Sequence, residues 1–525
     1  MHSEKSHHSP EKASAAESSS ARRSRLHRRR SHAHRHPDLL WDGKLPRREK
    51  LIASLSALTL VLAVVAYSTV PLWAQWWVFG LSALTFLCLF LPVGYDGLLS
   101  NSPMESWRRL RRFPIFWLGL LLFGLMLAQS LNPAWIVEVG EKTTRVRPNP
   151  AHVGWLPIGV DAPFSSKATL GGMNGWRQML LFSGPWFLLC AWWAGMERRR
   201  SWVGVAWTVL VLGLILVGWG AQMRIGNTFE LNGLYNHGNT SFFATFLYQN
   251  QAAAWYSLLF ALAVGMALWH WERAVAGRAN KGGPHFLASG FAVMIALGMV
   301  FTLSFGGMVT LAVLLLVCTP VAVLWDWIRH GVEKNLVIGL GVSAMLLAVV
   351  AGVFVTTSDL QEVEQKLRRK FDLAHKQSLD DRAPLRRATW SLITYRDNDY
   401  LLYGYGAGSY RWLSPGFLRQ QPEFRNKQGK LTHRTNYAHC DWLQMIAEWG
   451  VLGFGLVALG LLWTVWRFLR AWRRWTPVVF MFLAGALLFM AHAWMEFLIY
   501  SPPLLGLFFF IVLAAYRIGL KAPSS

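Results

Sequence analysis

Residues 434–453 read Arg434-Thr-Asn-Tyr-Ala-His439-Cys-Asp-Trp-Leu-Gln-Met-Ile-Ala-Glu448-Trp-Gly-Val-Leu-Gly453, and they join a long polar segment to an apolar one. The apolar residues continue to about position 466, which is long enough for a helix that crosses roughly 30 Å of hydrocarbon. Asp441, Gln444 and Glu448 follow i, i+3, i+7 spacing, so they share one face of that helix. The stretch predicts a membrane helix that begins with a histidine and a polar stripe.

The composition outside this stretch also indicates a membrane protein. The chain has 525 residues, of which 53% are hydrophobic and only 15% are charged, more apolar surface than one soluble core could cover. The net charge of +24 could suggest nucleic acid as a partner. However, the basic residues form short clusters between apolar runs, which is typical of orientation signals in membrane proteins, so no nucleic-acid partner is expected.

Apolar runs of membrane-spanning length recur from Leu51 onward. They predict an all-α polytopic membrane protein with about twelve transmembrane helices. The predicted spans are 51–68, 72–95, 114–130, 177–195, 202–221, 243–268, 285–303, 306–327, 335–355, 443–466, 477–497 and 502–519.

Basic residues alternate between the connecting segments in a way that fixes a predicted orientation, with both termini in the cytoplasm. Residues 1–48 are predicted to be a disordered basic cytoplasmic tail, because no apolar stretch there could bury itself. Its histidines at 32–36 could bind metal, but a solvated tail is the favoured interpretation. Spans one to nine fill 49–355, a large extracytoplasmic loop fills 356–442, and the last three spans fill 443–525. The loops predicted to face the cytoplasm carry Arg108, Arg109, Arg111 and Arg112; Arg198, Arg199 and Arg200; Arg273, Arg278 and Lys281; Arg329 and Lys334; and Arg467, Arg470, Arg473 and Arg474.

Segments 131–176, 222–242 and 356–442 are the outward segments long enough to carry chemistry. In the longest, residues 360–371 have the spacing of an amphipathic helix, and a second helix is predicted to begin at Asp381 with Pro384 in its first turn. Residues 404–410 are rich in glycine but lack the Lys-Ser/Thr of a phosphate-binding loop, so a tight turn is predicted.

A histidine at the junction of a loop and a helix, such as His439, can accept a proton near neutral pH or can simply cap the helix. Outward loops should be poor in arginine, and their many arginines therefore suggest an anionic ligand such as a diphosphate. Salt bridges and lipid contacts remain the alternative for each arginine. The sequence contains no HExxH, CxxC or GxSxG motif, so a mechanism without metal or cofactor is expected. The outward arginines are Arg224, Arg382, Arg386, Arg387, Arg396, Arg411, Arg425 and Arg434.

Four separated motifs resemble the O-antigen ligase and polymerase superfamily of bacterial envelope glycan assembly. They are Phe246-Leu-Tyr-Gln-Asn250-Gln-Ala252; Arg386-Arg-Ala-Thr-Trp390 with Leu402-Tyr-Gly-Tyr-Gly-Ala-Gly-Ser-Tyr410; Ala438-His-Cys-Asp-Trp-Leu-Gln-Met-Ile-Ala-Glu448-Trp-Gly-Val-Leu-Gly453; and Ala491-His492-Ala-Trp-Met-Glu496-Phe. Cys440 stands where this family commonly has Asn, and Glu496 where it commonly has Asp.

The resemblance implies a glycosyltransferase at the outer face of the bacterial inner membrane, acting on a polyprenyl-diphosphate-linked glycan. His439 would be the general base on an acceptor hydroxyl, and Arg224 with Arg386 or Arg387 would bind the diphosphate. Glycan, lipid or protein could be the acceptor, and membrane lipid surrounds the protein. The expected supporting residues are Arg434, Asp441, Glu448, His492 and Glu496.

Two other classes of protein stay open at this point. A transporter of a small anion such as bicarbonate would also have twelve spans with polar residues inside the membrane. Such a carrier typically binds its substrate between broken helices at the membrane midplane, whereas the polar candidate residues here are predicted to gather at the outer face of the membrane. A structural scaffold would explain the spans but not the outward arginines.

Overall fold

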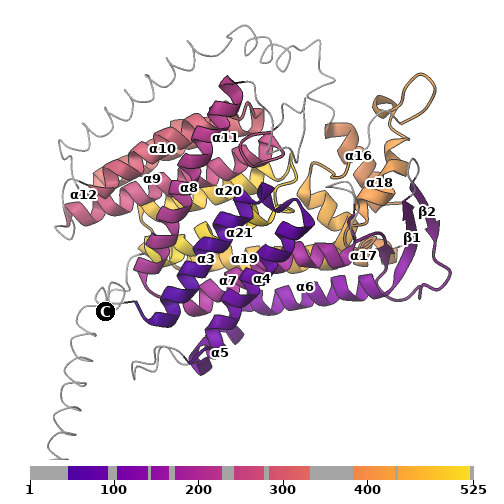
Figure 1. The fold of residues 1–525 in the computed structure, drawn as a ribbon, viewed down its shortest axis with the longest axis horizontal. Helices are drawn as coiled ribbons and strands as arrows, with labels where there is room; N and C mark the ends of the chain where they lie inside the picture. The colour runs from indigo at the N-terminus through magenta and orange to yellow at the C-terminus, as the bar shows by residue number, and fades with distance from the viewer. Residues whose placement is uncertain are drawn as a thin grey trace, which may run out of the picture.

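The computed structural model describes residues 45–92, 103–139, 144–164, 172–226, 242–276, 283–330, 382–395, 398–431 and 435–520. Most of the predicted tail 1–48, the predicted ninth span at 335–355, the predicted amphipathic helix at 360–371 and Arg434 lie outside these residues. The described part is mostly helical, as Figure 1 shows.

Helices of the described part coincide with eleven of the twelve predicted spans. Eight of them are long and apolar enough to cross a membrane by length and composition, which makes the chain a multi-pass membrane protein. The span helices are α3 (Arg47–Val65), α4 (Leu72–Leu87), α6 (Pro114–Leu131), α7 (Gly175–Gly195), α8 (Arg199–Ile225), α9 (Gln249–Val275), α10 (Pro284–Phe301), α11 (Phe305–Val313) continued by α12 (Thr319–His330), α19 (Asp441–Arg470), α20 (Pro477–His492) and α21 (Pro502–Ala514).

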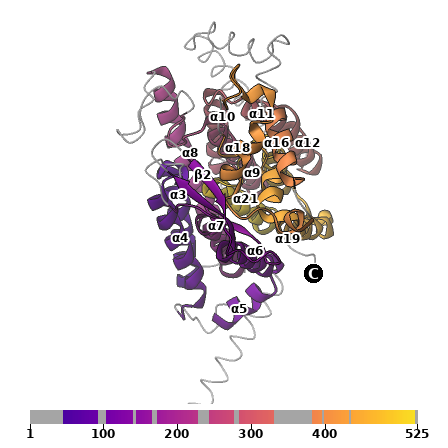
Figure 2. The ribbon, with the colours of Figure 1, turned by 90° about the vertical axis from the view of Figure 1, so that its right-hand side faces the viewer.

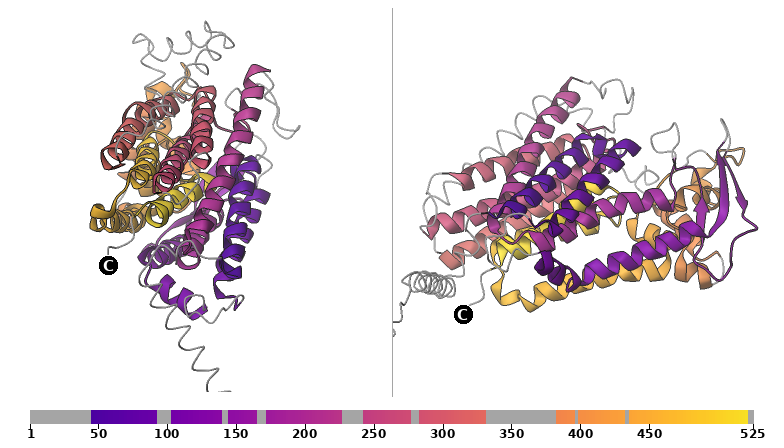
Figure 3. Two further views of the ribbon diagram at one scale, coloured as in Figure 1. Left: turned by 90° about the vertical axis from the view of Figure 1, so that its left-hand side faces the viewer. Right: turned by 60° about the horizontal axis from the view of Figure 1, so that its bottom comes forward.

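Helix α9 lies at the centre of the bundle, where it packs against α10, α20, α8 and α21. Small residues allow these close approaches because lipid-embedded helices associate chiefly through van der Waals packing. A Cβ on Gly265 would lie 2.2 Å from Phe482, and one on Gly485 would lie 2.4 Å from the Cβ of Ala261. The left panel of Figure 3 shows the helices side by side in this bundle.

Helix α19 runs beside α6, as the right panel of Figure 3 shows. Gly450 interrupts it with φ 66° and ψ −175°, so the helix is kinked there. At the kink a Cβ would lie 2.2 Å from the carbonyl oxygen of Leu402 and 2.5 Å from the backbone nitrogen of Gly404. The glycine therefore allows the segment at Leu402–Gly404 to contact the helix backbone.

The described parts of segments 131–176 and 356–442 gather at one end of the molecule (Figure 1, right; Figure 2). Here lie α16 (Arg382–Ile393), α17 (Asn398–Tyr403) and α18 (Tyr410–Leu418), and α16 confirms the helix predicted near Asp381. A three-stranded sheet lies at the same end, and the sequence analysis did not predict it. Its order is β2 (Thr144–Pro148), β1 (Pro133–Val139), β3 (Gly159–Asp161), with β1 antiparallel to β2 and parallel to β3.

Several predicted span boundaries differ from the helices, and two of these differences affect the candidate site. The helix predicted at 243–268 begins at Gln249, because residues 242–248 form an irregular segment in which Ala244 has φ 49°. The helix predicted at 477–497 ends at His492. Glu496 therefore lies in the segment that connects α20 to α21, outside both helices.

Candidate active site

Hydrogen bonds join the segment between α20 and α21 to the first residue of α19. Oδ2 of Asp441 accepts hydrogen bonds from the backbone N–H groups of Leu498 and Ile499, both at 2.7 Å. The backbone N–H of Asp441 donates in turn to the carbonyl of Ala493 at 3.0 Å. These bonds hold the residue before the helix, Cys440, and its neighbour His439 beside Glu496.

Glu496 is only 1% exposed, and four side chains from other parts of the chain contact its carboxylate. Nδ1 of His439 lies 3.1 Å from Oε2, and the hydroxyl of Tyr248 donates to the same oxygen at 3.0 Å. Nδ2 of Asn250 donates to Oε1 at 2.6 Å, and the guanidinium of Arg382 pairs with that oxygen. Both carboxylate oxygens are thus saturated by donors, two of which can carry positive charge.

These contacts set the ionisation of Glu496. Burial alone raises the pKa of a carboxyl group, but the hydrogen bond from His439 and the charges of His439 and Arg382 outweigh it here. The pKa of Glu496 therefore lies below its ordinary value, and the group is a carboxylate at neutral pH. Burial, together with this negative charge, raises the pKa of Tyr248, which keeps its proton and donates.

His439 is held in an unusual backbone conformation with φ 49°, which costs about 1–2 kcal/mol for a residue other than glycine. Its side chain is 22% exposed and meets the ring of Phe497 edge-on at 5.0 Å. A carboxylate only accepts hydrogen bonds, so Nδ1 of His439 carries the hydrogen that faces Glu496. The neutral ring then has its lone pair on Nε2, the arrangement that a general base requires.

Arg224 approaches the same group of residues from the end of α8. Its Nη2 lies 3.4 Å from both Oε1 of Gln249 and the carbonyl oxygen of Thr302. Gln249 lies between the two residues that contact Glu496, and Ser304 donates to Oδ1 of Asn250 at 2.6 Å. The structure therefore brings this predicted arginine and His439 to one region, although 215 positions separate them in sequence.

The arginines of α16 separate onto different faces. Arg382 and Arg386 are one turn apart, and Arg382 reaches Glu496 while Arg386 lies close enough to Cys440 to oppose the rise that burial causes in the pKa of that thiol. Arg387 is exposed instead, and it pairs with Oε1 of Glu423 at 2.5 Å. Arg386 thus shares a face of α16 with Arg382 and lies near Cys440, whereas Arg387 lies on another face and pairs with Glu423.

Glu448 lies seven residues after the first residue of α19, and its partners differ from those of Glu496. Its side chain accepts hydrogen bonds from Gln178 at 2.5 Å, Tyr500 at 2.9 Å, and Gln444 and the backbone N–H of Tyr410 at 3.3 Å. Its carbonyl oxygen accepts from the N–H of Gly406 at 2.9 Å. Glu448 therefore joins α7, α19 and the glycine-rich turn, which confirms the predicted turn at 404–410.

His492 ends α20 as a buried residue, and a Cβ on Gly306 would lie 2.5 Å from its Nε2. It is packed against α11, four residues before Glu496. Arg434 is outside the described residues.

Sequence reasoning missed several contacts of Glu496. Tyr248 and Asn250 lie within a motif quoted for the family resemblance, and Arg382 is among the outward arginines, so each carried a signal. Ser304 contacts Asn250 and not Glu496 itself, and only the folded chain brings these two residues together. Within the described ranges, no group of three or more His, Cys, Asp or Glu residues is arranged to hold a metal ion.

Comparison with known families adds an independent finding. Residues 290–458 match the O-antigen ligase family. This match confirms the resemblance on which the sequence analysis drew. The O-antigen ligase region includes His439, Arg382, Arg386 and the first part of α19, while Glu496, Tyr248 and Arg224 lie beyond it. The match indicates a glycan ligase or polymerase, and it gives no support to an anion transporter. No curated protein matches the chain.

Proposed function

We propose that this protein is a glycosyltransferase that moves or polymerises a polyprenyl-diphosphate-linked glycan at the outer face of the bacterial inner membrane. The observation that carries the proposal is the contact between Nδ1 of His439 and the carboxylate of Glu496, in a region that also receives Arg224 and Arg386. The O-antigen ligase match supports the reaction class.

In this mechanism Nε2 of His439 removes the proton from an acceptor hydroxyl as the oxygen attacks the anomeric carbon of the donor. The new glycosidic bond forms while the bond from that carbon to the diphosphate oxygen breaks. Glu496 fixes the tautomer of His439 and stabilises the imidazolium that results. General-base assistance of this kind contributes about 10²–10⁴-fold to a rate.

The leaving diphosphate gains negative charge as it departs, and cations already in place stabilise that charge without reorganisation. We assign Arg224 and Arg386 to this role, since they reach the region from different helices. Arg382 pairs with Glu496 and is 30% exposed, so it orients the carboxylate and adds positive charge at the edge of the site.

The acceptor distinguishes a polymerase from a ligase, and the lipid-linked intermediates of a deletion strain distinguish the two experimentally. Accumulation of lipid-linked single repeats is the expected result for a polymerase, and accumulation of finished lipid-linked polymer is the expected result for a ligase. Normal glycans and normal intermediates in the deletion strain would refute the proposed function.

A further inference from the structure

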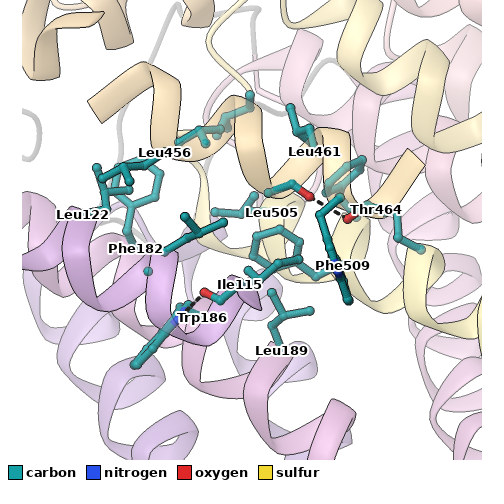
Figure 4. A pocket seen from close by; sticks show the side chains of 18 of the residues that line it. Ile115, Leu122, Phe182, Trp186, Leu189, Leu456, Leu461, Thr464, Leu505 and Phe509 are labelled. Carbon is teal, nitrogen blue, oxygen red and sulfur yellow. Dashed lines mark hydrogen bonds between the residues drawn. The ribbon is translucent and has the colours of Figure 1, made fainter. Parts of the chain in front are cut away.

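An apolar cavity of about 180 Å³ lies between α6, α7, α19 and α21 (Figure 4). Its wall includes Leu122, Leu456 and Leu505, and it is partly open to the surroundings of the protein. Two polar side chains of the wall donate their hydrogen bonds to backbone carbonyls of the protein. Trp186 donates to the carbonyl of Ile115 at 3.4 Å, and Thr464 donates to that of Gly460 at 2.9 Å. Away from Arg467, the wall therefore offers almost only hydrocarbon to an occupant.

The cavity ends at a cation. Arg467 lies on the wall, with its guanidinium 5.8, 5.6 and 5.1 Å from the ring centres of Trp193, Trp463 and Tyr516. It also donates to the hydroxyl of Tyr516. In the part of the chain that the structure describes, no carboxylate forms an ion pair with it. Aromatic rings and one hydroxyl thus hold a charged group in place at the mouth of an apolar channel.

Further positive charge surrounds this mouth. Arg470 and Arg473 follow on the same end of α19, and Arg111 and Arg112 precede Phe113, another residue of the wall. All four are exposed. The nearby acids Glu105 and Glu197 both pair with Arg109. An anion at the mouth would therefore meet an uncompensated positive field.

The mouth and the candidate active site lie on opposite sides of the hydrocarbon. Arg467 follows Asp441 by 26 positions on α19, a rise of about 39 Å, which exceeds the roughly 30 Å of the bilayer core. On α19 the wall runs from Met445 to Phe468, about 35 Å, and its part from Leu456 to Arg467, about 16 Å, matches one leaflet at the Arg467 end. A donor whose diphosphate is beside His439 cannot have the same diphosphate beside Arg467.

We propose that this cavity binds one acyl chain of an acidic phospholipid in the leaflet opposite the active site, with the phosphate against Arg467. Hydrocarbon gains little on moving from lipid into an apolar cavity, so packing and the headgroup contact must determine selectivity. An acidic headgroup is favoured because a zwitterionic one adds no net charge to the attraction.

The test uses the full-length protein purified in mild detergent and native mass spectrometry after addition of dioleoyl phosphatidylglycerol or dioleoyl phosphatidylcholine. We expect a single phosphatidylglycerol to resist dissociation from the wild type, and phosphatidylcholine to leave readily. Arg467→Gln should lose the retained lipid, while the matched exposed variant Arg470→Gln should keep it. His439→Ala should also keep it, which separates this inference from the proposed function.

A second variant guards against misfolding of the first. A Cβ on Gly460 would be 3.8 Å from Leu118 and 3.9 Å from Ile115, so Gly460→Phe fills the cavity without removing any charge. It should abolish retention as well. Equal retention of the two phospholipids, equal loss in Arg467→Gln and Arg470→Gln, or unchanged retention in Gly460→Phe would each overturn the proposal. Co-purification of a polyprenyl phosphate that phosphatidylglycerol does not displace would also overturn it.

Discussion

Glu496 and Glu448 are both 1% exposed and lie near the same end of the molecule, but their surroundings differ in kind. Glu448 receives its hydrogen bonds from neutral groups on Gln178, Tyr500, Gln444 and a backbone N–H. Glu496 contacts Arg382 and His439, which can be charged and are partly exposed. Burial alone therefore does not distinguish a carboxylate of the reaction from one of the framework.

The different partners of the two carboxylates suggest different roles in proton transfer. A carboxylate enclosed by neutral donors stabilises a junction of helices, since each donor would lose its partner if the carboxylate were absent. A carboxylate bonded to a half-buried histidine can stabilise an imidazolium that forms and disappears during each turnover. On this comparison we propose that Glu448 stabilises the packing of the helices and that Glu496 takes part in the reaction.

The largest expected effect comes from His439→Ala. Without the base, glycan transfer should fall about 10²–10⁴-fold while the protein inserts and folds normally. Envelope glycans in a null strain that expresses the variant provide the measurement. His152→Ala is the matched control, because His152 is an exposed histidine of another outward segment. Normal glycans with a properly inserted His439→Ala protein would refute the assignment of His439 as the general base.

Glu448→Ala should break the framework instead. It leaves Gln178, Tyr500 and the N–H of Tyr410 buried with no acceptor, at about 1–3 kcal/mol each. We expect a large fall in melting temperature in detergent, with activity lost in parallel. A variant that melts like the wild type but lacks activity would place Glu448 in the chemistry and end the contrast with Glu496.

Glu496→Gln should have the opposite pattern, a fall in activity on the order of tenfold to 10²-fold with normal insertion, because His439 loses its charged partner. The lowered pKa of Glu496 also predicts a pH dependence. A lowered pKa stabilises the fold above the ordinary pKa of glutamate, about 4.3, and that stabilisation is lost as the pH falls further. The difference in melting temperature between wild type and Glu496→Gln should therefore shrink below about pH 4.3.

Glu138→Gln is the control for this titration, since Glu138 is an exposed acid that pairs with Arg147 at 2.9 Å. It should change neither activity nor the pH dependence. A difference between wild type and Glu496→Gln that stays constant as the pH falls well below about 4.3 would contradict the assigned ionisation.

Gly404→Ala tests how firmly the turn is joined to Glu448. The residue has φ 77°, and an added Cβ would lie 2.4 Å from the carbonyl oxygen of Glu448. We expect a loss of roughly 1–3 kcal/mol in unfolding free energy from strain and overlap together. Gly429→Ala separates the two causes, because Gly429 has φ 75° with nothing within 4 Å. Equal melting temperatures for the two variants would show that backbone conformation, and not the contact with Glu448, sets the effect.

The spans could be predicted because each one is a local property of about twenty residues. Eleven predicted spans appear as helices, and the turn at 404–410 and the helix near Asp381 were also predicted. The site could be predicted only in part. His439 and Arg224 followed from position and resemblance, and their approach to each other depends on tertiary packing. No local pattern indicated that α20 would end at His492, since the apolar run continues past it. The sheet at 133–161 was missed because only the partner strands define it.

The smallest expected effect concerns Arg387, one of the arginines predicted to bind the diphosphate. Its exposed ion pair with Glu423 contributes less than about 1 kcal/mol, so Arg387→Gln should leave melting temperature and glycan transfer nearly unchanged. Arg386→Gln is the matched variant one position earlier, on the side of α16 that faces Cys440, and it should weaken transfer. Comparing these two variants tests whether the charged site around Glu496 includes Arg386 but not Arg387. Equal losses of activity in the two variants would mean that the diphosphate spans both faces of α16, and that the charged site extends beyond the contacts of Glu496.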